Sequence, residues 1–126
     1  MIDNKKLLIV LISLVFVMKD IVVKMAEVFK ALSDPTRLRI IRMLASNMVD
    51  TLCVADLAGQ LGITQPAASQ HIKVLKNIGI LEPNRKGFRV YYTVNRDMML
   101  AYKENIDELF ELAFQRCEQF PLCKEQ

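Results

Sequence analysis

The residue types that most often carry chemistry in proteins are scarce in this sequence. The three cysteines are Cys53, Cys117 and Cys123, an odd number without a repeating spacing, and the one histidine is His71. An odd set of cysteines favours reduced thiols over a secreted disulfide scaffold. A single histidine excludes most hydrolytic zinc sites and any triad that needs a second histidine. The chemistry that remains is that of thiolates, which bind soft metal ions or become oxidised.

Acid–base and phosphate chemistry also lack their usual residues. Asp34 and Asp56 have no carboxylate partner at a useful spacing, so we interpret them as helix caps or solvated side chains. There is no glycine-rich phosphate loop. His71 falls near the apolar side of a predicted helix, where we expect a packed, hydrogen-bonded ring, with a phosphate contact as the alternative. The sequence therefore predicts a binding protein and not an enzyme.

Basic and acidic residues are separated along the chain. Residues 51–96 contain six Lys or Arg against two acidic residues, whereas residues 97–126 contain three against seven. With 126 residues, 52% hydrophobic and 25% charged, the chain has the size and balance of one packed domain. The basic middle predicts contact with a polyanion, and the acidic end is expected to face solvent or a partner.

The first 24 residues differ from the rest of the chain. The run from Leu7 to Met18 is apolar apart from one serine and follows two lysines. As a helix it measures ~18 Å, too short for a hydrocarbon core of ~30 Å, and Lys19 and Asp20 interrupt any extension. Three interpretations stay open: an apolar helix or strand that packs in a dimer, a start codon assigned too early, with Met18 or Met25 as the natural start, and a membrane anchor. We expect an extension over 1–24, a domain over 25–120 and a tail over 121–126.

From Met25 onward the hydrophobic spacing and the turn residues predict mostly helices. Helices are expected over 25–32, 35–47, 54–61, 65–79 and 96–119, with a short strand at 51–53 and a hairpin whose second strand is 88–94. Asn95 is expected to cap the last helix. Apolar residues form a long stripe on that helix, which predicts a two-fold dimer surface together with the first helix or, alternatively, part of the core. The stripe contains Met98, Met99, Tyr102, Ile106, Leu109, Phe110, Ala113 and Phe114.

The segment VADLAGQLGITQPAASQHIKVLKNIG has the pattern of a helix-turn-helix, with Gly62 in the turn. On the second helix the apolar side chains share one arc and the polar ones the other, and no Asp or Glu occurs between Ala58 and Leu81. A solvated polar face is the alternative to a DNA-reading one. The candidate DNA contacts here are Thr64, Gln65, Ala67, Ser69, Gln70, Lys73 and Lys76.

A hairpin with a basic tip follows this helix directly. Arg85, Lys86 and Arg89 are placed to meet backbone phosphates or the minor groove, as in the wing of a winged helix. A basic solvated loop is the alternative. The fold class predicted from these elements is mainly α with a small β-hairpin wing, a winged helix-turn-helix.

Three segments of the chain have the motifs of a known family: FKALSDPTRLRIIRML, LCVADLAGQLGITQPAASQHIKVLKNIGIL and RKGFRVYYTV. Through these segments the chain resembles the ArsR/SmtB-type winged-helix transcriptional regulators over about residues 25–120. It implies a homodimeric repressor on double-stranded DNA with an inverted-repeat operator, usually released by a metal, metalloid or redox signal. The reduced thiols expected above fit a cytoplasmic location. Two alternative interpretations are a winged helix that serves only as a protein-interaction module and a membrane-tethered sensor.

The effector sites of that family match this sequence only in part. One site pairs two cysteines as Cys-x-Cys at the start of the third helix, where this chain has Cys53 but Ala55. Another uses Asp and His ligands on the last helix. His71 cannot supply such a ligand, because it lies on the second helix of the helix-turn-helix, the recognition helix. Cys117 and Cys123, together with Cys53, are the candidate ligands of a thiolate-bound metal or metalloid ion, and inert free thiols are the alternative. No cofactor is assigned with certainty.

Overall fold

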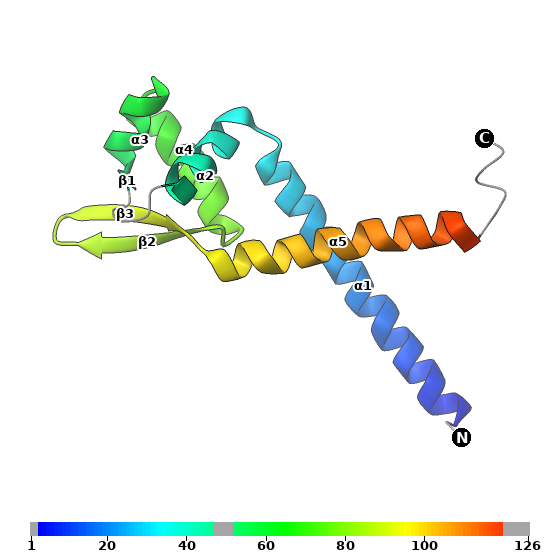
Figure 1. The fold of residues 1–126 in the computed structure, drawn as a ribbon. Coiled ribbons are helices and arrows are strands. Elements are labelled where there is room, and N and C mark those ends of the chain that lie inside the picture. The colour runs from blue at the N-terminus through cyan, green and yellow to red at the C-terminus, as the bar shows by residue number, and fades with distance from the viewer. Residues whose placement is uncertain (1–2, 47–51, 120–126) are drawn as a thin grey trace.

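The computed structural model describes residues 3–46 and 52–119 (Figure 1). Five helices and three short strands follow one another along this part of the chain. Their bounds are α1 Asn4–Leu32, α2 Pro35–Ser46, β1 Leu52–Cys53, α3 Val54–Leu61, α4 Gln65–Asn77, β2 Leu81–Lys86, β3 Arg89–Val94 and α5 Arg96–Gln119. The predicted mainly helical fold with a small hairpin is confirmed.

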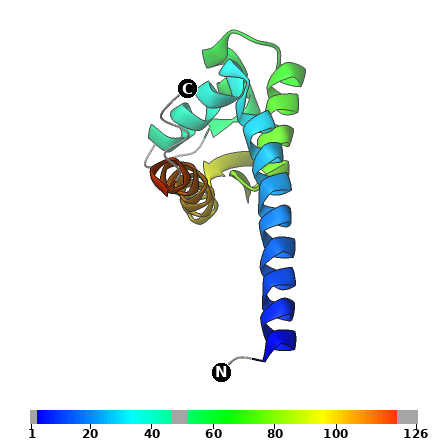
Figure 2. The same cartoon turned by 90° about the vertical axis from the view of Figure 1, so that its right-hand side faces the viewer.

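The first helix is much longer than the sequence pattern indicated. α1 continues through residue 24 without a break, although its helical periodicity was expected only from Met25. Figure 2 shows its N-terminal half extending beyond the rest of the domain, and the apolar side chains of this half, Leu7 to Phe16, are exposed. Within the ranges that the structure describes, no helix combines the length and apolarity needed to cross a membrane. The division of the chain at residue 24 stays a prediction.

The three strands form one antiparallel sheet in the order β1-β3-β2. Leu52 pairs with Tyr92, and β2 pairs with β3 from Leu81 opposite Val94 to Lys86 opposite Arg89. β2 is an edge strand, which tolerates Pro83 because its outer backbone groups face solvent. The sequence pattern predicts a second strand that includes Phe88, but β3 begins at Arg89. Gly87 has a φ of 64° and forms the turn together with Phe88.

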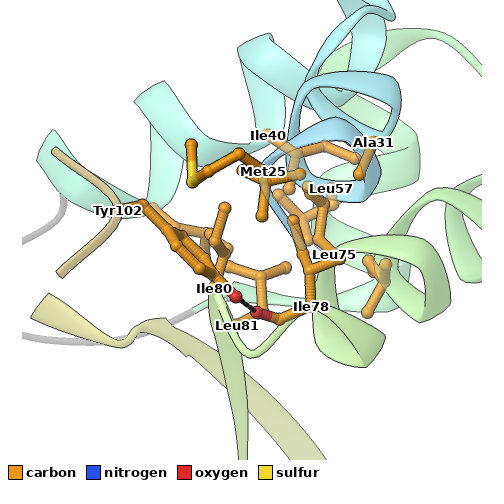
Figure 3. Close-up of a cluster of buried hydrophobic side chains, with 12 residues drawn as sticks. Met25, Ala31, Ile40, Leu57, Leu75, Ile78, Ile80, Leu81 and Tyr102 are labelled. Carbon is orange, nitrogen blue, oxygen red and sulfur yellow. Dashed lines mark hydrogen bonds between the residues drawn. The ribbon is translucent and has the colours of Figure 1, made fainter. Parts of the chain in front are cut away.

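Side chains from both ends of the chain build one hydrophobic core (Figure 3). Met25 and Val28 from α1 meet Leu75 and Ile80, which flank the end of α4. Burial of such apolar side chains is the main contribution to folding free energy. The remaining buried members of the cluster are Ala31, Ile40, Leu44, Leu57, Ile72, Ile78, Leu81 and Tyr102. Because Ile72, Leu75 and Ile78 belong to this cluster, the core fixes how α4 is presented.

The helix boundaries follow from local capping. The Asp34 carboxylate accepts hydrogen bonds from the amides of Thr36 and Arg37, and the Asn95 side chain accepts one from Met98. Both predicted caps are confirmed, and such caps satisfy amides that have no partner within the helix. α4 ends at Asn77 instead of 79, because Gly79 adopts a φ of 79° just beyond it.

Candidate nucleic-acid interface

The helix-turn-helix holds the start of α4 by two local devices. Gly62 closes α3 in the left-handed conformation, with a φ of 67°, which a residue with a Cβ adopts only at a cost. At the other side of the turn, the Thr64 hydroxyl accepts a hydrogen bond from the amide of Ala67 at 3.3 Å. Pro66 lies in the first turn, where its missing N–H has no helical partner to lose. The first turn of α4 is therefore fixed by local contacts, and Thr64 and Gln65 at its start are exposed.

The two faces of α4 are sorted as the sequence predicted. Ala68, Ile72 and Leu75 are buried, whereas most of the candidate contacts are exposed. Ala67 differs from the other candidates because it is half-buried and its amide is engaged in the cap. The exposed candidates are Thr64, Gln65, Ser69, Gln70, Lys73 and Lys76. Amides, hydroxyls and ammonium groups on one face can donate to base edges and to phosphates.

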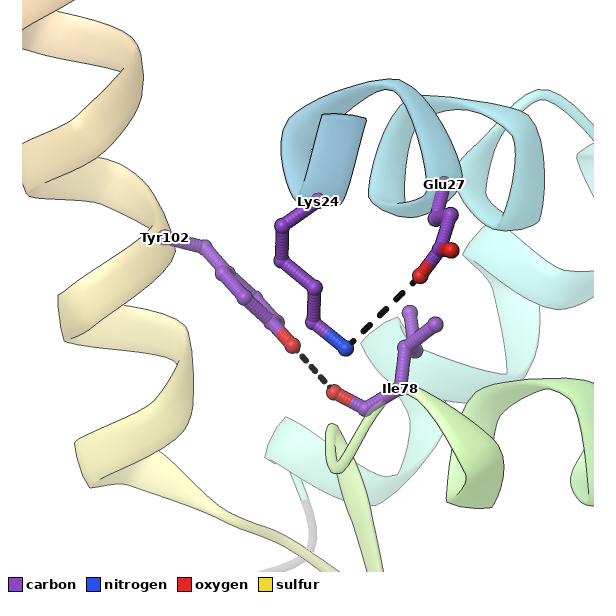
Figure 4. Close-up of polar contacts among 4 residues, drawn as sticks. All are labelled: Lys24, Glu27, Ile78 and Tyr102. Carbon is purple, nitrogen blue, oxygen red and sulfur yellow. Dashed lines mark hydrogen bonds and ion pairs between the residues drawn. The ribbon is translucent and has the colours of Figure 1, made fainter. Parts of the chain in front are cut away.

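A hydrogen bond from the last helix holds the C-terminal end of α4. Tyr102 is 6% exposed, and its hydroxyl donates to the carbonyl of Ile78, the C-cap residue of α4. In Figure 4 the Lys24 side chain lies beside this pair, with its ammonium 3.8 Å from the Glu27 carboxylate. The sequence placed Tyr102 on an apolar stripe but carried no signal for its polar partner, which lies 24 residues away.

His71 faces α2 and not the exposed side of α4. Its Nδ1 lies 3.5 Å from the Arg37 guanidinium, and Arg37 Nε donates to the Ala31 carbonyl at 2.5 Å. The predicted packed and hydrogen-bonded histidine is therefore confirmed. Arg37 also supports Asp34, since its amide is the main cause that holds the pKa of that carboxyl below its ordinary value. These contacts join the end of α1, the start of α2 and the middle of α4.

The hairpin carries its cations on an exposed segment. Every residue from Glu82 to Arg89 is exposed, including the predicted contacts Arg85, Lys86 and Arg89. The Lys86 ammonium lies 6.0 Å from the centre of the Tyr91 ring, at the limit of a cation–π contact. Phe88 lies among these cations in the turn, and its place in a β-type sequence pattern gave no sign of this.

A hollow of about 280 Å³ lies between α4 and β3. Ser69, Lys73 and Lys76 line it from the helix, and Tyr92 lines it from the strand. Two ammonium groups at one hollow raise the local positive potential, which attracts a polyanion. The exposed face of α4 thus places its ammonium groups beside β3.

The thiol at the start of α3 is already engaged. The Cys53 Sγ donates to Asp56 Oδ2 at 3.0 Å, and the Cys53 amide donates to the same oxygen at 3.2 Å. The thiol and then the amide are the main causes that lower the pKa of Asp56. Asp56 is therefore the third residue of α3 in a capping box, so its predicted capping role is confirmed. With Ala55 in the second position, this place does not fit a pair of cysteine ligands.

The other predicted thiol ligands fall outside what can be described. Cys117 lies in α5, but its side chain is not among those described, and Cys123 lies beyond the described residues. In the described part of the chain, no three His, Cys, Asp or Glu side chains gather to hold a metal ion. His71 belongs to α4, so it supplies no ligand on α5. A sensor site on these thiols stays a prediction.

Comparison with known proteins identifies relatives that are named as transcriptional regulators or repressors. A family model described as "Bacterial regulatory protein, arsR family" matches residues 34–82, from the start of α2 into β2. The chain is 37% identical over 86 residues to an uncharacterized HTH-type transcriptional regulator of Methanocaldococcus jannaschii, covering 68% of this chain and 94% of that protein. It is 34% identical over 93 residues to the arsenical resistance operon repressor of Escherichia coli, covering 74% of each.

Solved structures agree with the fold. An ArsR-like transcriptional regulator from Rhodococcus superimposes with a TM-score of 0.67 at 24% identity, covering 77% of this chain and 89% of the other. A homodimeric winged helix-turn-helix DNA-binding domain from Mycobacterium bovis superimposes with a TM-score of 0.56 at 26% identity, covering 75% and 82%. The predictions of a winged helix-turn-helix and of a regulatory protein rather than an enzyme are thereby confirmed. This protein belongs to the ArsR family of transcriptional regulators.

Proposed function

We propose that this protein is a homodimeric repressor that binds an inverted-repeat operator in double-stranded DNA in the cytoplasm. The observation that carries the proposal is the exposed, acid-free face of α4, which is fixed at one end by the Thr64 cap and at the other by Tyr102. Ser69 and Gln70 read base edges in the major groove, and Lys73 and Lys76 contact phosphates. Arg85, Lys86 and Arg89 extend this contact to the adjacent backbone.

The test is a gel shift on the promoter upstream of its own gene, with unrelated duplexes of the same length as competitors. We expect a complex that a specific competitor displaces and that forms with two protomers per site. A complex with no preference for any duplex would contradict a specific operator, and no complex with any duplex would favour the protein-interaction module.

The dimer is proposed to form through α1 and α5. The far part of α5 exposes Leu109, Phe110 and Phe114, and α1 exposes apolar side chains along its length. Exposed apolar surface of this extent is typical of an interface. The domain that begins near Met25 is expected to suffice, because the amphipathic pattern begins there. Among the described side chains of α1, the core contacts begin at Ile21, so the test below keeps that residue.

A chain that begins at Met18 tests this division. It removes residues 1–17, and none of the described side chains in this range belongs to the core, so the melting temperature and DNA binding should be unchanged. Analytical ultracentrifugation should still find a dimer. A monomer would place the apolar N-terminal half of α1 in the interface and would contradict the proposed boundary at residue 24.

The signal is proposed to be a thiophilic metal or metalloid ion, or an oxidant, that acts on Cys117 and Cys123. Support comes from the pair of thiols near Pro121, which should end the helix and let Cys123 turn back toward Cys117. It also comes from relatives named for such ions, the arsenical repressor above and a homolog of the cadmium resistance regulator of Staphylococcus aureus, 38% identical and covering 71% of this chain and 66% of that protein.

The double variant Cys117→Ser, Cys123→Ser tests the sensing thiols, with Cys53→Ser as the matched control. We expect arsenite, cadmium or peroxide to release the parent protein and the Cys53 variant from DNA, but not the double variant. Equal release from the parent and the double variant would exclude these two thiols.

A further inference from the structure

The tip of the hairpin presents a large apolar side chain that packs against none of the described residues. Phe88 has a relative accessibility of 103%, the highest among the exposed large hydrophobic residues of the described chain. It occupies the two-residue turn between Lys86 and Arg89, the last pair of the ladder. The positive φ of this turn falls on Gly87, so the turn itself does not require an aromatic residue at the next position.

The surroundings of Phe88 are cationic. Arg85, Lys86 and Arg89 are exposed on the same segment. The acidic residue of the hairpin, Glu82, lies at its base. Its carboxylate there accepts a hydrogen bond from the side-chain amide of Asn95 at 2.9 Å. An aromatic ring framed by three cations does not match an apolar protein pocket, which would leave those charges without partners. It matches a polyanion that also offers stacked rings, and duplex DNA has this chemistry.

We propose that Phe88 is a wedge that enters the minor groove and inserts between two base pairs, while the neighbouring cations hold the flanking phosphates. The proposal rests on the DNA-binding function proposed above and adds a deformation of the DNA to it. Apolar side chains of minor-groove proteins insert in this way, partly unstacking one step and bending the duplex. A phenylalanine on a two-strand ladder suits this role because it has only two side-chain torsions to order.

Such a wedge would give the protein a preference at positions where no side chain reads a base edge. Pyrimidine–purine steps unstack most easily, so duplexes with TA or CA steps beneath the wing would bind more tightly. In a two-fold dimer, Phe88 of each protomer would act on one outer flank of the operator. The recognition helices and the wing tips would then select different features of the same site.

The experiment uses duplexes that the wild-type protein selects from a random pool, with 2-aminopurine placed at successive flanking positions. Binding of the wild-type protein should raise the fluorescence at one flanking step on each side, because unstacking removes quenching. Phe88→Ala should abolish that rise, reduce the bend in a circular-permutation assay and weaken binding about tenfold. Phe88→Leu should retain part of both effects, since leucine also serves as a wedge.

Arg85→Ala is the matched control on the same hairpin. It should weaken binding and lower the salt dependence, yet keep the fluorescence rise at saturating protein. The melting temperature of Phe88→Ala should equal that of the wild type, because the ring is fully exposed.

Unchanged affinity and unchanged fluorescence in Phe88→Ala, with the Arg85→Ala effect present, would overturn the wedge and leave the proposed function intact. Insertion would also be overturned if the wild-type protein raised no fluorescence at any flanking position, even if Phe88→Ala bound DNA more weakly. If the wild-type protein selects no duplex from the pool, the proposed function and the wedge fall together.

Discussion

Replacing Tyr102 by Phe tests whether the last helix holds the recognition helix in place. The substitution removes one hydroxyl and keeps the ring, so the core is not emptied. It deprives the Ile78 carbonyl of the donor that the structure gives it, in a place where Tyr102 is only 6% exposed. A buried polar group left without its partner costs about 1–3 kcal/mol in the free energy of unfolding. For a chain of this size that loss lowers the melting temperature on the order of 5 °C.

The assay is urea unfolding at one fixed protein concentration, since the stability of a dimer depends on concentration. Tyr92→Phe is the matched control, because that tyrosine is half-buried and water can replace its lost contacts. We expect a clear loss for Tyr102→Phe and little change for the control. Operator affinity should fall further than the lost stability explains, because the end of α4 is no longer tied to α5.

Equal unfolding free energies for Tyr102→Phe and the wild type would refute this reasoning. They would mean that the Ile78 carbonyl finds water or another donor without cost. A loss of stability with unchanged operator affinity would separate the two claims, because the hydrogen bond would then support the core without positioning α4.

Three further predictions concern the DNA surface and the pH dependence. Gln70→Ala should reduce discrimination between operator and mutated operator by ~1–3 kcal/mol, whereas Lys73→Ala should weaken binding to all duplexes alike; equal effects in competition assays would contradict the assigned roles. Replacing both Arg85 and Lys86 by Ala should make the plot of log affinity against log salt less steep by ~0.9 per lost phosphate contact, and an unaltered slope would mean a solvated tip. The lowered pKa of Asp34 means that its stabilisation is present above the ordinary aspartate pKa and is lost as the pH falls through the depressed value. Asp34→Asn keeps a capping side chain, so it should flatten this acid-side loss in thermal unfolding measured at low pH, and an unchanged profile would assign the loss to other groups.

The sequence alone determined most of the helices and their caps. Asp34, Thr64 and Asn95 each bind amides two or three residues ahead, so the capping signal lies within one turn of the helix that it starts. The periodic apolar residues likewise assigned the buried face of α4, because a helix repeats its faces every 3.6 residues. Local order of this kind is readable from neighbouring residues, and it was enough to predict the helix-turn-helix and the basic hairpin.

The tertiary structure decided what depends on distant segments. The apolar run of α1 has no periodicity, so its helical state and its exposed position could not be read from spacing. Tyr102 meets Ile78 and Arg37 meets His71 across 24 and 34 residues, pairs that no local pattern indicates. Whether Phe88 lies in a strand or in the turn depends on how the two strands pair. The pairing of Leu81 with Val94 at the far end of the hairpin sets this register, which leaves Phe88 in the turn. Local chemistry forms the elements, and only their packing decides which side chains meet and which stay exposed to bind a partner.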